Sequence, residues 1–317
     1  MKPQSLETLA LPVIVAPMFL VSGPDLVKAS CLAGVVGSFP FPNARDIATL
    51  DKWLDDIGQT IKNTPHAAPF AVNLTTHSTY DRLQDEIALI ANHKPKIVIT
   101  ALGGPEPVLE VVKSYGGTVI ADVNSMHYAR KAVDKGVDGL ALIAAGAGGH
   151  TGHMAGFSFV QAVREFFDGL VVLGGGIGTG QAIHAAEIAG ADLCYMGTHF
   201  IATPESLASQ DYKEMVVKAQ FEDLVLSDQL TGVKAYYLRQ SLIKMGFDPD
   251  NMQAGHGMQL QDSQSQIKAW RDVWSAGHGV GSVQAIKPVQ DIIHQLVNEY
   301  EQTFETPTPA QRRQAYV

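Results

Sequence analysis

Short runs of apolar residues recur along the chain, and a segment with helical spacing follows most of them. There are eight such runs, at residues 13–17, 35–39, 70–74, 97–102, 119–123, 139–144, 170–175 and 193–197. Because their apolar positions are continuous and do not alternate with polar ones, both faces of each strand are expected to be buried. The helical segments between them make the strands parallel, since a parallel connection needs a crossover.

Eight consecutive β/α units predict an α/β protein with a TIM (β/α)8 barrel, and a doubly wound open sheet is the main alternative. A complete Gly-x-Gly-x-x-Gly turn after the first strand would favour the open sheet. Ala16, Pro17 and Met18 stand there instead. The barrel is therefore the preferred interpretation.

The β/α pattern stops after strand eight and returns only near the end of the chain. Residues 203–282 are expected to form a helical insertion that acts as a lid, so that the barrel comprises residues 1–202 and 283–304. Residues 305–317 contain Pro307 and Pro309 and are expected to form a C-terminal arm.

Composition and charge narrow the class of protein. The chain has 317 residues, of which 46% are hydrophobic and 17% charged, so a large core without disulfides is expected. Its net charge is −9 without a basic run, which disfavours nucleic acid and membranes as partners. Cys31 and Cys194 lie in apolar segments and are expected to be buried thiols, with a disulfide as the less favoured alternative. The first residues carry no export signal or membrane span, so a cytoplasmic location is expected.

Glycine-rich segments follow the seventh and eighth strands, at the end of the barrel where function collects. Residues 174–176 are all glycine, and Met196, Gly197 and Thr198 end the eighth run. Glycines leave backbone N–H groups accessible, and the start of a helix favours an anion. The two loops therefore predict a phosphate site, whereas two tight turns are the alternative.

The sixth strand leads into another glycine-rich loop, residues 145–154, which carries His150 and His153. An imidazole with a near-neutral pKa at this end of the barrel suits a proton acceptor or a partner for an anionic substrate. A solvated surface loop is one alternative. A metal site is disfavoured, because the loop holds no Cys, Asp or Glu to complete the ligands.

Polar residues also end other strands. The Asn73 amide suits the edge of a heterocycle, and Thr100, Asp122 and Ser125 could line the same opening, although Asp122 could equally cap a helix. Met18 offers an apolar floor for a flat ring. Six other histidines are expected to be structural, namely His77, His127, His184, His199, His256 and His278.

Four motifs, in this order and spacing, resemble the nitronate monooxygenase family, formerly called 2-nitropropane dioxygenases. They are PVIVAPM at 12–18, GAGGHTG at 146–152, VVLGGGI at 171–177 and CYMGTHFIAT at 194–203. The resemblance runs from about residue 11 to residue 300 and includes AWRDVWSAGHGVGSV at 269–283. It implies a TIM barrel that holds FMN without a covalent bond.

The resemblance also implies roles for individual residues. His150 matches the catalytic histidine of the family, which orients the nitronate or takes a proton from a nitroalkane. The FMN phosphate would be held by Gly175, Gly176, Gly197 and Thr198. Further cofactor contacts are implied for Ala16, Pro17, Met18, Asn73, Gly148, Tyr195 and Met196.

The activity implied is the oxidation of alkyl nitronates with O2 to a carbonyl compound and nitrite. The alternative is an NAD(P)H-dependent flavin reductase acting on a quinone or an enoyl thioester, as in neighbouring branches. A non-catalytic barrel that binds a phosphorylated ligand, or a flavin-free isomerase, is a third interpretation. The partners expected are a small-molecule substrate and O2, and a homodimer is allowed.

Some positions depart from the usual family pattern. Ile143 and Gly146 replace a Gln and a Glu before the histidine, and His199 replaces an Arg. Residues 178–180 read Gly-Thr-Gly where Asp-Gly-Arg is more typical. Because the phosphate glycines are intact while polar groups near the reacting centre are missing, the pattern supports FMN binding better than it supports a particular substrate.

Overall fold

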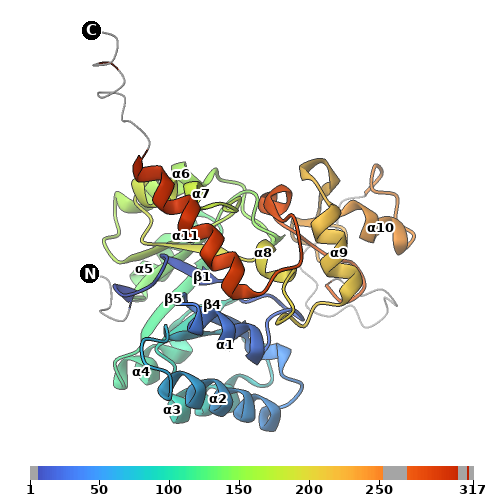
Figure 1. Cartoon of the computed structure of the whole chain (residues 1–317). Helices are drawn as coiled ribbons and strands as arrows, with labels where there is room; N and C mark the ends of the chain where they lie inside the picture. Colours follow the sequence, from blue (N-terminus) through green and yellow to red (C-terminus); the bar gives the residue numbers. More distant parts are fainter. Residues whose placement is uncertain (1–5, 253–269, 306–312, 314–317) are drawn as a thin grey trace.

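Eight parallel strands form a barrel, and each comes from one of the eight apolar runs (Figure 1). The computed structural model describes residues 6–252, 270–305 and 313. The sheet order is β1-β9-β8-β6-β5-β4-β3-β2, and a bridge between Ile14 and Val36 joins its two edges. The strands are β1 Val13–Val15, β2 Gly37–Pro40, β3 Phe70–Thr75, β4 Ile97–Ala101, β5 Thr118–Val123, β6 Gly139–Ile143, β8 Leu170–Gly174 and β9 Leu193–Met196. The predicted TIM (β/α)8 barrel is confirmed.

Helices cover the outside of the barrel. They are α1 Pro24–Leu32, α2 Ile47–Lys62, α3 Leu83–His93, α4 Glu106–Ser114, α5 Met126–Asp134, α6 Gly156–Arg164, α7 Gly180–Ile188, α8 Thr198–Ile201 and α11 Val289–Glu305. The side chains of Asp46, Ser125 and Thr179 cap α2, α5 and α7 by accepting a backbone N–H in the first turn. No helix in the described residues is both long and apolar enough to cross a bilayer.

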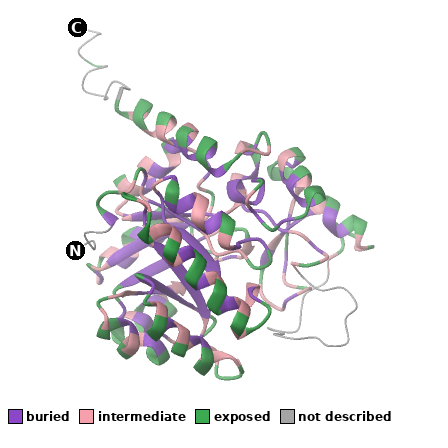
Figure 2. Cartoon of the chain, turned by 60° about the horizontal axis from the view of Figure 1, so that its bottom comes forward, coloured by how far each residue is buried: buried purple, intermediate pink, exposed green. Residues whose placement is uncertain are grey.

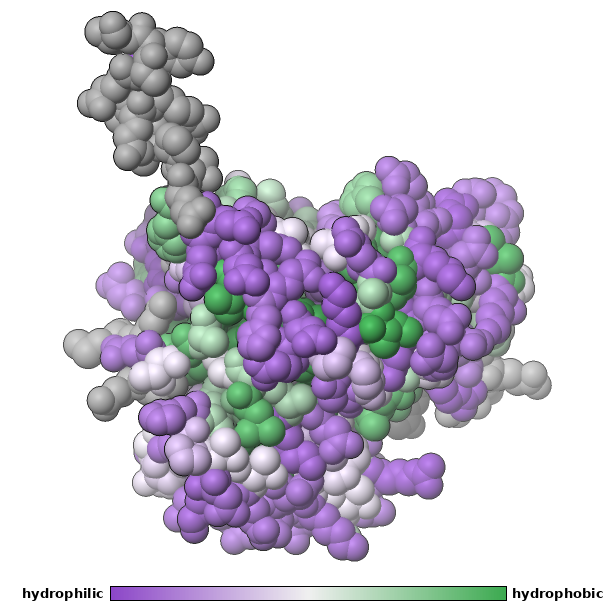
Figure 3. Space-filling view, viewed as in Figure 1, coloured by the Kyte–Doolittle hydropathy of each residue, from purple (hydrophilic) through white to green (hydrophobic). Residues whose placement is uncertain are grey.

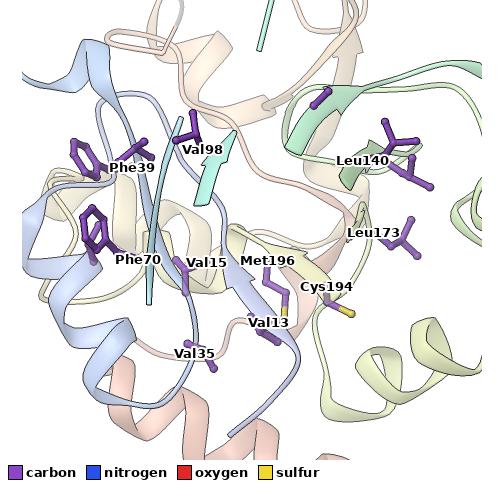
Figure 4. Close-up of a cluster of buried hydrophobic side chains, with 14 of the residues drawn as sticks. Val13, Val15, Val35, Phe39, Phe70, Val98, Leu140, Leu173, Cys194 and Met196 are labelled. Atoms are coloured by element: carbon purple, nitrogen blue, oxygen red, sulfur yellow. The ribbon is translucent and has the colours of Figure 1, made fainter. Parts of the chain in front are cut away.

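Two hydrophobic layers explain why the strands are apolar on both faces. One layer fills the barrel and includes Ile14, Val36, Ala71, Ile99, Ile120, Ala141, Val172 and Leu193. The other lies between the strands and the helices, where Val13, Phe39 and Leu173 pack (Figure 4). Figure 2 shows the buried strands enclosed by helices whose outer faces are exposed, and the face seen in Figure 3 is mostly hydrophilic.

Cys31 and Cys194 belong to the outer layer and are not joined in a disulfide. Burial raises the pKa of the Cys31 thiol to about 12. This thiol therefore stays protonated and packs as a small apolar group, as expected from its apolar surroundings in the sequence.

The segment after strand eight is not purely helical, which corrects one expectation. It contains α9 Gln210–Lys218 and α10 Arg239–Lys244, but also two strands, β10 Leu224–Ser227 and β11 Ala235–Leu238. β11 pairs with β7 Gly149–His150, which the barrel contributes from the loop after β6. These strands were missed because each is only four residues long and because β11 also pairs with β7, which lies far from it in sequence. Residues 253–269 and most of the expected arm at 305–317 lie outside the described residues.

Candidate functional site

The inner face of the barrel changes from apolar to polar at the carboxyl ends of the strands. Side chains alternate along a strand, so the inward positions after Ala71, Ile120 and Leu193 are Asn73, Asp122 and Tyr195. Asn73 Nδ2 donates a hydrogen bond to Asp122 Oδ2 at 3.3 Å, which links β3 to β5 over the intervening β4. Asn73, Asp122 and Tyr195 therefore form a polar layer, called the polar floor below, above the apolar core inside the barrel.

Two atoms of this floor are buried without a partner. They are Asp122 Oδ1 and the Tyr195 hydroxyl oxygen. Gly174 lies beside the tyrosine, and a Cβ built at this glycine would approach Tyr195 Cβ to 3.1 Å. Because folded proteins pair nearly all their buried polar atoms, two unpaired atoms in one floor indicate a place for a polar ligand.

Burial also shifts the ionisation of the floor. It raises the pKa of Asp122 to about 7, although the hydrogen bond from Asn73 opposes the shift. Burial, together with the Asp122 charge, raises the pKa of Tyr195 well above 10. Near neutral pH, Tyr195 is thus a hydrogen-bond donor, whereas Asp122 exchanges its proton.

His150 lies on β7 and is held at the opening by the segment inserted after strand eight. Ala235 pairs with His150, and Gly149 N donates to Ser275 Oγ at 2.8 Å. The Trp270 ring meets the imidazole edge-on at a centroid distance of 5.5 Å. His150 Nε2 is buried without a partner, and burial lowers the pKa of this imidazole below 6.5. The ring is therefore neutral at pH 7 and can accept a proton or a hydrogen bond.

The glycine loops meet at one short segment, residues 276–278. His278 N donates to Gly146 O at 2.9 Å, and Gly277 N donates to Thr198 Oγ1 at 3.0 Å. A Cβ on Gly148 would lie 2.7 Å from Gly277 N, and one on Gly176 would lie 3.8 Å from His278 Cβ. The loops after β6, β8 and β9 are thus brought together by residues about 80 to 130 positions later in the chain.

Sequence reasoning missed His278, which was expected to be structural. Its Nε2 is buried without a partner, and its ring meets those of Phe221 and Tyr236 edge-on at 4.8 and 4.6 Å. The glycines on both sides of it, Gly277 and Gly279, were the signal, because they repeat the pattern of the other strand-end loops. His256, by contrast, lies outside the described residues.

The loop after β1 borders the same opening. Ala16 N donates to Met196 O at 2.9 Å, and a Cβ on Gly197 would lie 3.2 Å from Met18 Sδ. Pro17 and Met18 are half-buried here. The Met196 side chain, in contrast, packs in the layer outside the barrel, so only its backbone faces the opening (Figure 4).

Other candidate residues do not offer a side chain to the opening. Ser125 caps α5, and the buried Thr100 hydroxyl lies 3.5 Å from Ile120 O. His153 is exposed, and His199 Nε2 lies 2.8 Å from Gly178 O and 3.0 Å from Ser282 Oγ. The described residues contain no group of three or more His, Cys, Asp or Glu suited to a metal ion.

The loop after β8 contains two glycines with positive φ. Gly175 and Gly176 have φ values of 130° and 71°, and Gly176 is exposed. Thr179 then caps α7, whose N-terminus follows directly. Together with the polar floor and the neutral His150, this backbone suits a flat ligand with polar edges and an anionic tail.

Comparisons with known proteins show which sequences this chain resembles. Residues 76–299 match the model of the nitronate monooxygenase family. The nitronate monooxygenase of Paraburkholderia phytofirmans is 23% identical over 93% of both chains. A Mycobacterium tuberculosis protein named (3aS,4S,5R,7aS)-5-hydroxy-7a-methyl-1-oxo-octahydro-1H-indene-4-carboxyl-CoA dehydrogenase is 26% identical over 74% of this chain, and the match spans only 64% of that relative's length.

Solved structures resemble the whole barrel. FabK from Thermotoga maritima has a TM-score of 0.76 and 25% identity, with 99% of this chain and 97% of that one covered. A nitroalkane oxidase from Streptomyces ansochromogenes has a TM-score of 0.76 at 21% identity, covering 94% and 98%. The second likeness concerns the fold alone. The family model matches more than two thirds of the residues. This chain therefore belongs to the nitronate monooxygenase family.

Proposed function

We propose that this protein is an FMN-dependent oxidoreductase that oxidises alkyl nitronates with O2 to a carbonyl compound and nitrite. One observation carries the proposal: four buried polar atoms without a partner gather around one opening of the barrel. They are Asp122 Oδ1, the Tyr195 hydroxyl, His150 Nε2 and His278 Nε2. Such atoms would be costly unless a ligand pairs with them.

The residues present fit FMN. Gly175, Gly176, Gly197 and Thr198 would hold the phosphate, because Gly176 exposes its backbone and Thr198 Oγ1, which accepts from Gly277 N, keeps its own hydrogen to donate. Gly148 would border the same site. The ring would meet Asn73 and Tyr195 at its polar edge, and Ala16, Pro17, Met18 and the Met196 backbone on its apolar side.

FMN, when bound, supplies the electron chemistry of the reaction. The protein supplies position and proton transfer. In this proposal His150 Nε2 either donates a hydrogen bond to the anionic nitronate or, in the other neutral tautomer, accepts a proton from a nitroalkane. The neutral ring at pH 7 allows both. The described parts of the inserted segment, residues 203–252 and 270–282, border the site, where they would keep water from the reacting atoms.

Release of nitrite tests the proposal. Protein saturated with FMN is mixed with propyl nitronate in air, and nitrite is measured against FMN alone. Enzyme-dependent release of nitrite and uptake of O2 are expected. Absence of nitrite at all substrate concentrations would remove the nitronate activity.

A flavin reductase that uses NAD(P)H and acts on a quinone or an enoyl thioester is the second candidate. Ile143 and Gly146 favour it, because the side of the opening next to His150 lacks the polar groups usual in the family, and Ile143 packs against the apolar filling of the barrel. The relative named as a CoA dehydrogenase points the same way. Anaerobic mixing with NADH or NADPH separates the candidates, since rapid loss of the yellow colour supports the reductase.

A further inference from the structure

Asp122 is the acidic side chain of the barrel floor, and its two oxygens have different surroundings. Oδ2 accepts a hydrogen bond from Asn73 Nδ2 at 3.3 Å, whereas Oδ1 is buried with no partner. A proton on this carboxyl would therefore reside on Oδ1, because Oδ2 is already an acceptor. The floor thus places the proton of this carboxyl on an atom that has no partner within the protein.

No charged side chain faces Asp122 from the other strands of the barrel. Asn73 and Tyr195 are the polar neighbours in its layer. Because side chains alternate along a strand, the inward positions of the other strands at this level are Ala16, Ser38, Ala101, Ile143 and Gly174. Burial and the Asn73 hydrogen bond account for the pKa of Asp122 near 7, without a contribution from a cation. The charge of this carboxyl is therefore not neutralised within the floor.

Reduction of a flavin adds negative charge to the ring system, and charge near the ring tunes its chemistry. In a buried site two negative charges repel strongly, because the surroundings screen them little. A carboxylate in the floor would oppose reduction, whereas a carboxylic acid would donate a hydrogen bond to the reduced ring. The two processes are therefore coupled.

We propose that Asp122 takes up one proton when the flavin in this site is reduced and releases it when the flavin is reoxidised. The electron pair comes from the substrate and passes, with one proton, to the flavin, while Asp122 itself is not oxidised or reduced. Its carboxylate gains a proton from solvent on Oδ1 and becomes a carboxylic acid. Asn73 is a positioning residue, since its hydrogen bond holds Oδ2 and leaves Oδ1 to the ligand. The inference rests on the proposed flavin cofactor.

The dependence of the flavin midpoint potential on pH tests this inference. FMN-loaded wild type is compared with Asp122→Asn, which keeps the shape but cannot exchange the proton, over pH 6 to 9. Above pH 7 the equilibrium constant for two-electron reduction should fall about 100-fold per pH unit in the wild type and about tenfold in the variant. Below pH 7, where Asp122 is already protonated, the slopes should converge. Asp134→Asn, the same change at an exposed position on α5, should behave as the wild type.

An infrared measurement on the wild type gives a second readout that does not depend on the variant. Reduction of the flavin at pH 8 should produce the C=O band of a protonated carboxyl in the difference spectrum. Equal slopes in wild type and Asp122→Asn, or the absence of this band, would overturn the inference while the flavin assignment stands. A protein that takes up no FMN overturns the proposed function and this inference together.

Discussion

At the scale of single residues, the site depends on polar atoms that the fold buries without a partner. Asp122 and Tyr195 are inward positions on strands whose earlier inward positions are apolar. His150 is neutral because burial lowers its pKa. The chemistry of these groups follows from their surroundings more than from their residue types.

Replacement of His150 tests its role in the reaction. His150→Asn should lower kcat for a nitroalkane by about 10² to 10⁴-fold, because the base is lost, while FMN content is unchanged. In the wild type, kcat/KM should decline only below pH 6.5, since the imidazole accepts a proton only while it is neutral and its pKa is lowered from 6.5. His153→Asn, on the same loop but exposed, is the matched control. An unchanged turnover in His150→Asn would remove His150 from the mechanism.

The loop after β8 allows a matched pair of glycine variants. Gly176→Ala and Gly116→Ala both place a Cβ at positive φ, 71° and 74°, so each should cost about 1 kcal/mol of stability. Only Gly176 lies at the opening, where a methyl group would occupy the approach of the phosphate. The Kd for FMN, measured by titration of the visible spectrum, should rise about tenfold or more in Gly176→Ala and stay unchanged in Gly116→Ala. Equal FMN affinity in both variants would place the phosphate elsewhere.

At the scale of elements, strand pairing holds the loop that carries His150 in place. β7 contributes Gly149 and His150 to a three-stranded sheet with β11 and β10, so the loop gains the backbone pairing of a strand. Ser275 links β7, β11 and α9. Its hydroxyl accepts a hydrogen bond from Gly149 N and donates one to Tyr236 O, and its carbonyl oxygen accepts one from the Tyr212 hydroxyl. The inserted segment therefore positions His150.

Removal of the Ser275 hydroxyl tests this coupling. Ser275→Ala should cost about 1 to 3 kcal/mol in stability and lower kcat about 10 to 100-fold, because His150 loses its fixed position. Ser241→Ala provides the comparison, since its buried hydroxyl accepts from Trp274 N at 2.7 Å without touching β7. It should lose stability but keep kcat. Similar kcat values for the two variants would show that the strand pairing does not govern catalysis.

At the scale of the whole molecule, the last helix holds the barrel together. α11 packs against α7 and α1, so the end of the chain returns to its first and seventh β/α units (Figure 1). Gly180, at the start of α7, is the point of closest approach: a Cβ there would collide with Tyr300 N and Leu296 O. Gly180 N also donates to Glu299 Oε2 at 2.8 Å.

An added methyl group tests the importance of this contact. Gly180→Ala should lower the free energy of unfolding by about 1 to 3 kcal/mol, because the two helices must move apart. Gly58→Ala, in α2, meets no atom within 4 Å and should instead stabilise the protein by up to about 1 kcal/mol, since alanine favours a helix. Urea unfolding followed by circular dichroism measures both. If Gly180→Ala has the same free energy of unfolding as the wild type, α7 and α11 can move apart at no cost and their close contact does not stabilise the protein.

The sequence by itself determined the eight strands, the barrel and the positions of the loops that carry the candidate residues. A strand buried on both faces has a local signature, and the residues after it must lie at the mouth of a barrel, so His150, Asn73 and residues 174–176 could be found without the structure. Only the tertiary structure decided that β11 pairs with β7, that residues 276–278 join three loops, and that Asn73 bonds Asp122. These contacts link residues 49 to more than 100 positions apart, and no local pattern of apolar or polar positions specifies such a partner.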